Sequence, residues 1–184
     1  MKKFIFISMI FFSFAFLGWI WEILWEMLKN GNLINSGVLH GPWLPIYGCG
    51  ALFIYLILNR FKKNKIVIFF GCFIICSIIE YITSIYLEKK YGLQWWNYSK
   101  RPFNLNGRVC LLYSTAFGIA GYFGIYDIIP FIKKIYKKMN YKLLVVLNII
   151  LISLFTFDIC YSFKYPHIVK RYKVSKYSII KANH

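Results

Sequence analysis

Five apolar runs, each long enough to cross a lipid bilayer, occupy most of this 184-residue chain. A hydrocarbon core about 30 Å thick requires roughly 20 apolar residues of helix, and the runs lie near residues 4–27, 43–61, 66–87, 109–132 and 143–163. Hydrophobic residues make up 59% of the chain, which is more than a soluble domain usually carries. The sequence therefore predicts an all-α integral membrane protein, a bundle of about five transmembrane helices with an aromatic-rich loop between the third and fourth.

The predicted organisation is a single polytopic membrane domain over residues 1–163, followed by a basic C-terminal tail over 164–184. The polar stretches 88–108 and 164–184 are too short for a separate soluble domain, and no G-x-x-x-x-G-K-[ST] phosphate loop is present. Any nucleotide-hydrolysing domain must therefore lie on another chain. We also expect no bound cofactor. The first apolar run lacks an A-x-A-like cleavage site and exceeds a usual signal core, so we expect a retained helix.

The net charge of +17 comes from lysines and arginines that lie almost wholly between or beyond the apolar runs. Anionic lipid headgroups are a simpler partner for such residues than nucleic acid, which we do not expect to bind. Lysines alternate with apolar residues over 133–139, which suits a short amphipathic segment at the membrane interface. Five spans place eleven basic residues on one side and twelve on the other, so the overall bias does not decide the orientation; the first loops favour a cytoplasmic N-terminus.

Two segments between the apolar runs are unusual. The first, "GVLHGPWLPIYGCGA" at 37–51, is dense in glycine and proline, which break helices. It is either an interfacial loop with a broken start to the second helix, which we favour, or a re-entrant segment that lines a cavity. The second, 88–108, combines aromatic and basic residues with a turn at Asn106-Gly107. It is either an aromatic belt at headgroup depth or a folded cap over the helix bundle.

Acidic residues inside apolar runs are costly to insert, so those that remain usually face a partner or a wet cavity. Glu80 is the leading candidate, because it lies within the third run and Ser84, one turn later, could hydrogen-bond its carboxylate. Glu22 and Glu26 lie four residues apart on the first helix; we favour Glu22 for function and Glu26 for the interface. The weaker candidates, Asp127 and Asp158, lie near a helix end or a tyrosine.

Histidine 40 stands in the glycine-rich segment and could relay protons to Glu22 or Glu80, although a lone histidine is more often a loop hydrogen-bonder. Cys72 and Cys76 share a helix face, but without a nearby histidine all five cysteines are interpreted as buried apolar residues and no metal site is expected. The candidate functional or substrate-pathway residues are Glu22, His40, Pro42, Tyr47, Glu80, Ser84, Trp96, Tyr98, Asn104 and Arg108. None of them is assigned a catalytic role.

The chain resembles a family of bacterial membrane proteins described as putative ABC-transporter type IV, or CmpB-like permeases. The likeness extends from about Phe12 to Pro130 and rests on four motifs in the family's order: "FLGWIWE" at 16–22, "GVLHGPWLPIYGCGA" at 37–51, "EYITSIYLEKKYG" at 80–92 and "WWNYSKRPFNLNGRVCL" at 95–111. Two positions depart from the family pattern: Ser36 replaces an arginine and Asn97 an aspartate. If those charges pair in relatives, this chain has lost both together.

This resemblance implies a permease-like, multi-pass subunit in the bacterial cytoplasmic membrane that works with a separate ATPase chain; it names no substrate. Two other classes stay open. One is a membrane scaffold or assembly protein that uses its small-residue stretch at 116–124 for close helix contact, within one chain or in a homo-oligomer. The other is a membrane-embedded enzyme that acts on a lipid or a lipid-linked group, with Glu80 or Glu22 as general acid or base and Arg101 or Arg108 holding an anionic headgroup.

Overall fold

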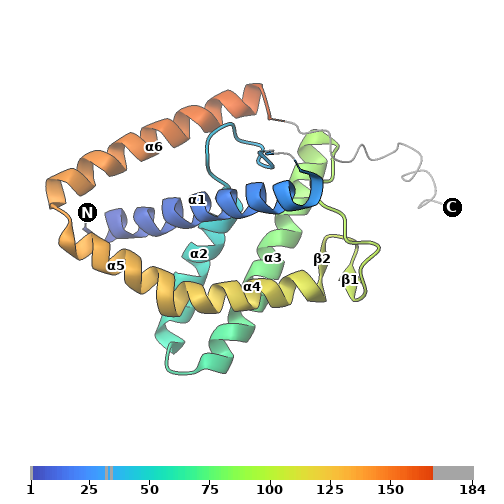
Figure 1. The fold of residues 1–184 in the computed structure, drawn as a ribbon, viewed down its shortest axis with the longest axis horizontal. Helices are drawn as coiled ribbons and strands as arrows, with labels where there is room; N and C mark the ends of the chain where they lie inside the picture. Colours follow the sequence, from blue (N-terminus) through green and yellow to red (C-terminus); the bar gives the residue numbers. More distant parts are fainter. Residues whose placement is uncertain (1, 32, 34, 168–184) are drawn as a thin grey trace.

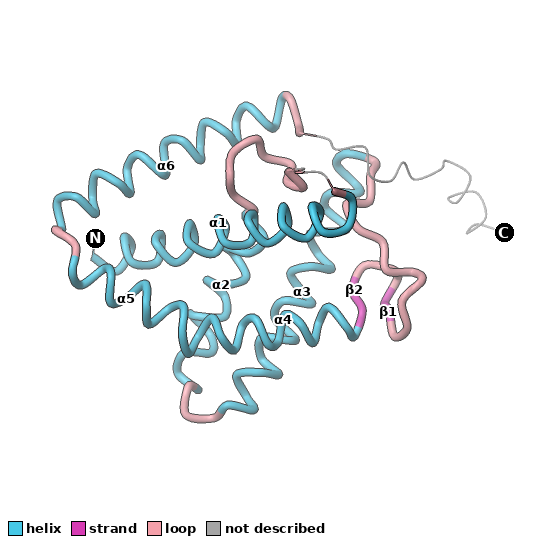
Figure 2. The backbone as a smooth tube through the Cα atoms, viewed as in Figure 1, coloured by secondary structure: helices cyan, strands magenta, loops and turns pink. Residues whose placement is uncertain are grey.

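Helices make up about three quarters of the computed structural model, which describes residues 2–31, 33 and 35–167 (Figures 1 and 2). Its elements in chain order are α1 (Lys2–Asn30), α2 (Pro45–Leu58), the 3-10 turn η1 (Asn59–Phe61), α3 (Lys65–Tyr91), β1 (Asn104–Leu105), β2 (Val109–Cys110), α4 (Leu111–Phe123), the π-helical turn η2 (Gly124–Ile128), α5 (Ile129–Lys138) and α6 (Tyr141–Lys164). The two short strands form an antiparallel hairpin. The greater part of the predicted tail lies outside the described residues.

Four helical segments are long and apolar enough to cross a membrane: α1, α3, α6, and the continuous helix Leu111–Lys138 formed by α4, η2 and α5. The predicted all-α membrane fold is therefore confirmed. The second apolar run forms a shorter helix, Pro45–Phe61, because the irregular backbone before Pro45 takes up the first part of the run. The amphipathic segment predicted over 133–139 is the C-terminal half of α5, and continues the helix rather than standing apart from it.

Local sequence signals set the helix ends. The Asn64 side chain accepts hydrogen bonds from the backbone N–H groups of Ile66 and Val67 at the start of α3, and Asn140 caps α6 in the same way. Gly92 ends α3 with a φ of 66°, a left-handed conformation that glycine adopts without strain. Pro45 occupies the first turn of α2, where its missing N–H has no helical partner to lose.

The core is formed where α1, α2, α3 and the α4–η2–α5 helix meet, and α6 lies along α1 on the outside (Figure 1). Ile10, Ile68 and Ile125, from three different helices, are among its fully buried side chains. The small-residue stretch of α4 packs within this chain: a Cβ added at Gly121 would lie 2.6 Å from the Cβ of Cys72. Close approach of α4 to α3 therefore accounts for these glycines without a second copy of the chain.

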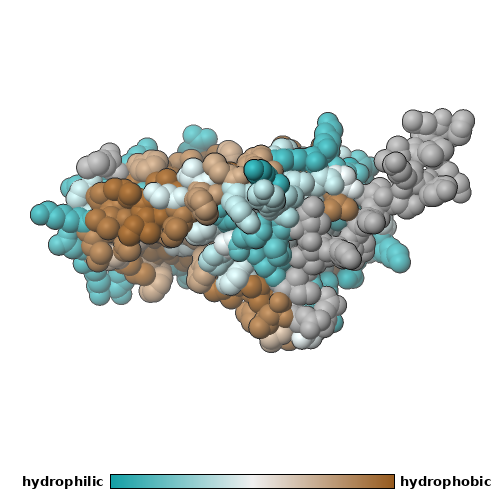
Figure 3. Space-filling view, turned by 90° about the horizontal axis from the view of Figure 1, so that it is seen from above, coloured by the Kyte–Doolittle hydropathy of each residue, from teal (hydrophilic) through white to brown (hydrophobic). Residues whose placement is uncertain are grey.

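The outward face of α3 is apolar. Ile66, Phe70, Ile74, Ile78 and Ile82, four residues apart, are all exposed, whereas the opposite face of the same helix is buried. Figure 3 shows similar hydrophobic surface over part of the molecule, bordered by hydrophilic side chains. An exposed apolar stripe of this length is the surface that lipid chains cover in a membrane protein.

The segment 35–44 runs back along α1 before α2 begins. The Leu44 N–H donates to the Ala15 carbonyl oxygen at 3.0 Å, and Ala15 stands about 20 Å from the start of α1 at 1.5 Å per residue. The segment thus descends from the end of α1 to its middle as irregular backbone. The segment is thus a loop before a shortened second helix, which is the alternative that we favoured.

Basic residues gather around the N-terminus, along α5 and on the turn between α2 and α3, and we call this part of the molecule the basic end. Hydrogen bonds from Tyr126 to the Lys62 carbonyl and from Tyr136 to the Lys2 carbonyl hold its segments together. Its lysines and arginine are Lys2, Lys3, Arg60, Lys62, Lys63, Lys65, Lys133, Lys134, Lys137, Lys138 and Lys142. The opposite, loop end holds the segment 92–110 and the start of the segment 35–44 (Figure 1). Glu22, Glu26, Glu80, Glu88 and Asp158 lie in the C-terminal halves of α1, α3 and α6, which lead toward it.

Candidate functional site

Two buried acids at the loop end are held in different ways. Glu80 of α3 is 4% exposed and Asp158 of α6 is 7% exposed. Glu80 lies with Glu22, Tyr47 and Tyr98 in a group that we call the Glu80 cluster. Asp158 lies against the segment 35–44.

Glu80 has only one of its two carboxylate oxygens hydrogen-bonded. The Tyr98 hydroxyl donates to Oε1 at 3.0 Å. Oε2 is buried and has no hydrogen-bond partner among the described residues. A buried acceptor without a partner destabilises the fold by about 1–3 kcal/mol, and more when it is charged, so its presence needs an explanation other than folding.

Glu22 of α1 provides a second carboxylate in this cluster. The Tyr47 hydroxyl, from the first turn of α2, donates to Glu22 Oε1 at 2.7 Å. Electrostatic interactions join the Glu22–Tyr47 pair to Glu80 and Tyr98. Gly18 allows this arrangement, since a Cβ at that position would lie 2.3 Å from the Tyr47 ring. The sequence predicted Glu22, Tyr47, Glu80 and Tyr98 separately, and the structure brings all four together.

The loop between α3 and α4 is folded so that Tyr98 reaches Glu80. Gly107, with a φ of 67°, accepts from the Tyr98 N–H at 2.7 Å, and Asn104 accepts from the Gly107 N–H at 2.9 Å. The Tyr98 ring stacks on Tyr113 of α4. Burial, followed by the charge of Glu80, raises the pKa of the Tyr98 phenol, which keeps it a donor. Asn104 thus shapes this loop rather than contacting Glu80.

Arg108 closes the loop against the last turns of α3. Its guanidinium forms an ion pair with Glu88 and donates to the Ser84 hydroxyl at 3.0 Å. The Arg108 carbonyl accepts from the Trp96 indole N–H at 2.8 Å. We predicted that Ser84 would hydrogen-bond Glu80; the described contact of its hydroxyl is instead with Arg108. Arg108, Ser84 and Trp96 therefore form a neighbouring group that positions the loop.

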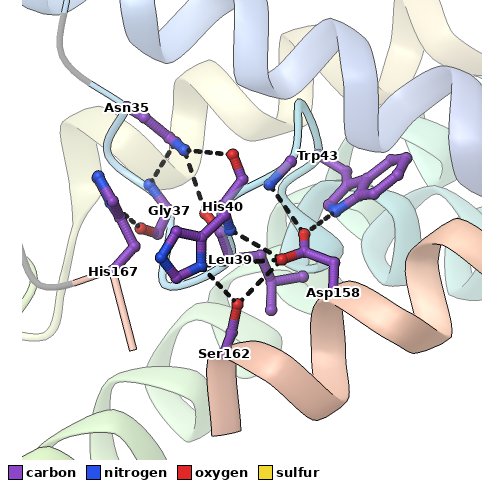
Figure 4. Close-up of polar contacts among 9 residues, drawn as sticks. Asn35, Gly37, Leu39, His40, Trp43, Asp158, Ser162 and His167 are labelled. Atoms are coloured by element: carbon purple, nitrogen blue, oxygen red, sulfur yellow. Dashed lines mark hydrogen bonds and ion pairs between the residues drawn. The ribbon is translucent and has the colours of Figure 1, made fainter. Parts of the chain in front are cut away.

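Asp158 is surrounded by donors from the segment 35–44 and from its own helix (Figure 4). One carboxylate oxygen, Oδ1, accepts from the His40 backbone N–H at 3.1 Å and from the Ser162 hydroxyl at 3.0 Å. The other, Oδ2, accepts from the Gly41 N–H at 2.8 Å and from the Trp43 indole N–H at 2.6 Å. Asp158 therefore satisfies backbone groups of an irregular segment that lies along α1, which is how such backbone is tolerated at membrane depth.

The His40 side chain belongs to this second group. Its Nδ1 lies 3.0 Å from the Ser162 oxygen, and because that hydroxyl donates its only proton to Asp158, His40 Nδ1 is the donor in this contact. From the sequence, His40 could either relay protons to Glu22 or Glu80 or simply form hydrogen bonds as a loop residue; its described side-chain hydrogen bond is with Ser162 of α6. Pro42, between Gly41 and Trp43 in the same segment, is exposed.

Asp158 was ranked low from the sequence, and Glu26 is more buried than we expected. Glu26 was expected among headgroups but is 5% exposed. Asp158 and its partners in the segment 35–44 are more than 110 residues apart in the chain, so no spacing rule could pair them. The available signal was the run of N–H groups around His40-Gly41, which an anionic side chain suits.

The two positions that depart from the family pattern lie in separate loops. Asn97 accepts a hydrogen bond from the Ser99 N–H. In the other loop Asn35, the residue before Ser36, accepts one from the Gly37 N–H. The Ser36 hydroxyl is buried without a partner among the described residues. No group of three or more His, Cys, Asp or Glu side chains suited to a metal ion occurs in the described part of the chain.

Comparison with known protein families gives one match. The model of the family described as "Putative ABC-transporter type IV" matches residues 9–163. This match extends beyond the 12–130 that we assigned from the motifs and includes α6 with Asp158. No curated protein and no solved structure matches the chain significantly.

Proposed function

The chain belongs to the putative ABC-transporter type IV family, and from that premise we propose that it is the membrane-spanning subunit of a transporter in the bacterial cytoplasmic membrane, energised by a separate ATPase chain. Its four membrane-crossing helical segments make it a multi-pass membrane protein. The described residues hold no fold for nucleotide hydrolysis, so energy would have to come from a partner. The Glu80 cluster would lie on the substrate pathway.

The observation that carries this proposal is the bare Oε2 oxygen of Glu80. An acid that served only to hold the fold would have both oxygens occupied, as those of Asp158 are. A buried carboxylate inside a membrane helix that keeps an oxygen free is typical of an ion or substrate pathway.

The charge distribution supports an orientation for the subunit. Basic residues favour the cytoplasmic side of a membrane, so the basic end would face the cytoplasm and the Glu80 cluster would lie toward the outer face. The exposed lysines of α5, Lys133, Lys134, Lys137 and Lys138, are then available to contact an acidic groove of an ATPase.

The proposal is tested by purifying the chain from native membranes in mild detergent and identifying bound proteins by mass spectrometry. We expect a stoichiometric ATPase. Replacing the four α5 lysines by glutamine should release it, whereas the same change at the exposed Lys89 and Lys100 of the loop end should not. A folded chain that carries no ATPase would contradict the proposal and favour the scaffold or enzyme alternatives; turnover by the isolated chain would single out the enzyme.

A further inference from the structure

We propose that the Glu80 cluster is a binding site for an organic ammonium cation. That this cation is the transported substrate rests on the function proposed above. That the cluster binds such a cation does not depend on that function. Four observations lead to it: a hydrogen-bond acceptor without a partner, a negative charge without a compensating cation, aromatic rings around the carboxylates, and too few oxygen ligands for a divalent metal ion.

The unused acceptor is Glu80 Oε2. The side chain is more than nine-tenths buried, and neither water access nor a described donor satisfies this oxygen. A primary ammonium group carries three N–H donors on a compact charge, so it can hydrogen-bond this oxygen and neutralise the carboxylate together.

The charge in the cluster is uncompensated by the residues around it. The described hydrogen-bond partners of Glu22 and Glu80 are the phenols of Tyr47 and Tyr98, which are neutral donors. The nearest arginine in this loop, Arg108, is already engaged by Glu88 and Ser84. A buried carboxylate, Glu80, and a half-buried one, Glu22, with neutral partners create a site where a cation is favoured over a neutral or anionic ligand.

Aromatic rings stand around the two carboxylates. Tyr98 stacks on Tyr113 with ring centroids 4.6 Å apart, and Tyr47 meets Phe117 edge to face at 6.4 Å. Aromatic faces attract organic ammonium ions through the ring quadrupole. Calcium and magnesium instead prefer six or more oxygen ligands in a polar shell, and two carboxylates among aromatic rings supply too few. The small number of oxygen ligands, together with the aromatic rings, therefore favours an organic ammonium ion over a divalent metal ion.

The test is calorimetric titration of the purified full chain in detergent with three molecules of matched shape: benzylammonium, benzyl alcohol and benzoate. We expect benzylammonium to bind at least tenfold more tightly than benzyl alcohol, and benzoate not to bind. Glu80→Gln should weaken benzylammonium binding at least tenfold. Asp127→Asn, the same type of change at an exposed acid on η2, should leave it unchanged.

Equal affinity for benzylammonium and benzyl alcohol, no binding by the folded wild-type chain, or unchanged binding by Glu80→Gln would each overturn the site. If Glu80→Gln does not fold, Glu22→Gln and Tyr47→Phe test the same cluster. The two proposals fail separately: ammonium binding without a bound ATPase removes the transport function and keeps the site, whereas a bound ATPase without ammonium binding removes only the site.

Discussion

Asp158 and Glu80 are acids of nearly equal burial toward the same end of the bundle, and they differ in how many donors surround them. Asp158 accepts four hydrogen bonds, and three of them connect α6 to the segment 35–44. Glu80 accepts one, from Tyr98, and keeps one oxygen bare. Burial alone therefore does not show whether the donors around an acid satisfy both of its oxygens.

The number of satisfied oxygens is what separates the two. A carboxylate enclosed by donors is stabilised as an anion and contributes to the fold, because each hydrogen bond to a charged group is worth about 1.5–3 kcal/mol. A carboxylate in which one oxygen has no hydrogen-bond donor contributes little to the stability of the fold, and that oxygen can still accept a hydrogen bond from a ligand. The same acid-to-amide substitution should consequently lower the stability of the fold much more at Asp158 than at Glu80.

Asp158→Asn should have the largest effect on stability. The amide retains one acceptor oxygen and turns an NH2 group toward N–H donors, so at least two hydrogen bonds are lost and donors of the segment 35–44 are left unpaired. We expect the free energy of unfolding to fall by about 3 kcal/mol or more, measured by unfolding in mixed detergent micelles. Cys160→Ser, at an exposed position of the same helix, is the control. A loss below about 1 kcal/mol would show that the three bonds from Asp158 to the segment 35–44 do not hold that segment.

Gly18→Ala should come next, because it alters the Glu80 cluster through packing. The new Cβ would lie 2.3 Å from the Tyr47 ring, and overpacking of this kind destabilises by about 1–3 kcal/mol. Displacement of Tyr47 should also weaken benzylammonium binding. Gly50→Ala is the matched control, since its Cβ would meet only the Cys76 sulfur, at 3.9 Å. Equal effects of the two substitutions in the unfolding assay would mean that Tyr47 is not fixed by this contact.

Ser162→Ala should remove one donor from Asp158 and leave the other three. The expected destabilisation is about 1 kcal/mol, smaller than that of Asp158→Asn, because the backbone and indole donors remain. Ser153→Ala, at an exposed position of α6, should be neutral in the same unfolding measurement. A loss as large as that of Asp158→Asn would indicate that the His40–Ser162–Asp158 chain acts as one unit.

The sequence predicted those features that depend on local composition. Apolar length identified the helices that cross the membrane, and the glycines and prolines of 37–51 marked the place where the second helix is interrupted. The cost of burying an acid in an apolar helix also singled out Glu80 before its surroundings were known.

Pairings across the fold could not be predicted in this way. Glu80 meets Tyr98 only because Gly107 and Asn104 turn the loop back onto α3, and Ser84 accepts from Arg108 through the same turn. The partners of Asp158 come from a segment that returns halfway along α1. Such contacts depend on how helices are placed relative to one another, and helical spacing within one segment carries no information on that.

Glu80→Gln should have the smallest effect on stability of the four. The glutamine oxygen can still accept from Tyr98, and removing a buried charge offsets the unpaired N–H groups that the amide introduces, as replacements of buried charges often do. We expect the free energy of unfolding to change by less than about 1 kcal/mol, in the same assay as Asp158→Asn, while benzylammonium binding is lost. A destabilisation as large as that of Asp158→Asn would contradict the distinction between the two acids, because it would show that Glu80 also holds the fold together and that its bare oxygen has no separate role.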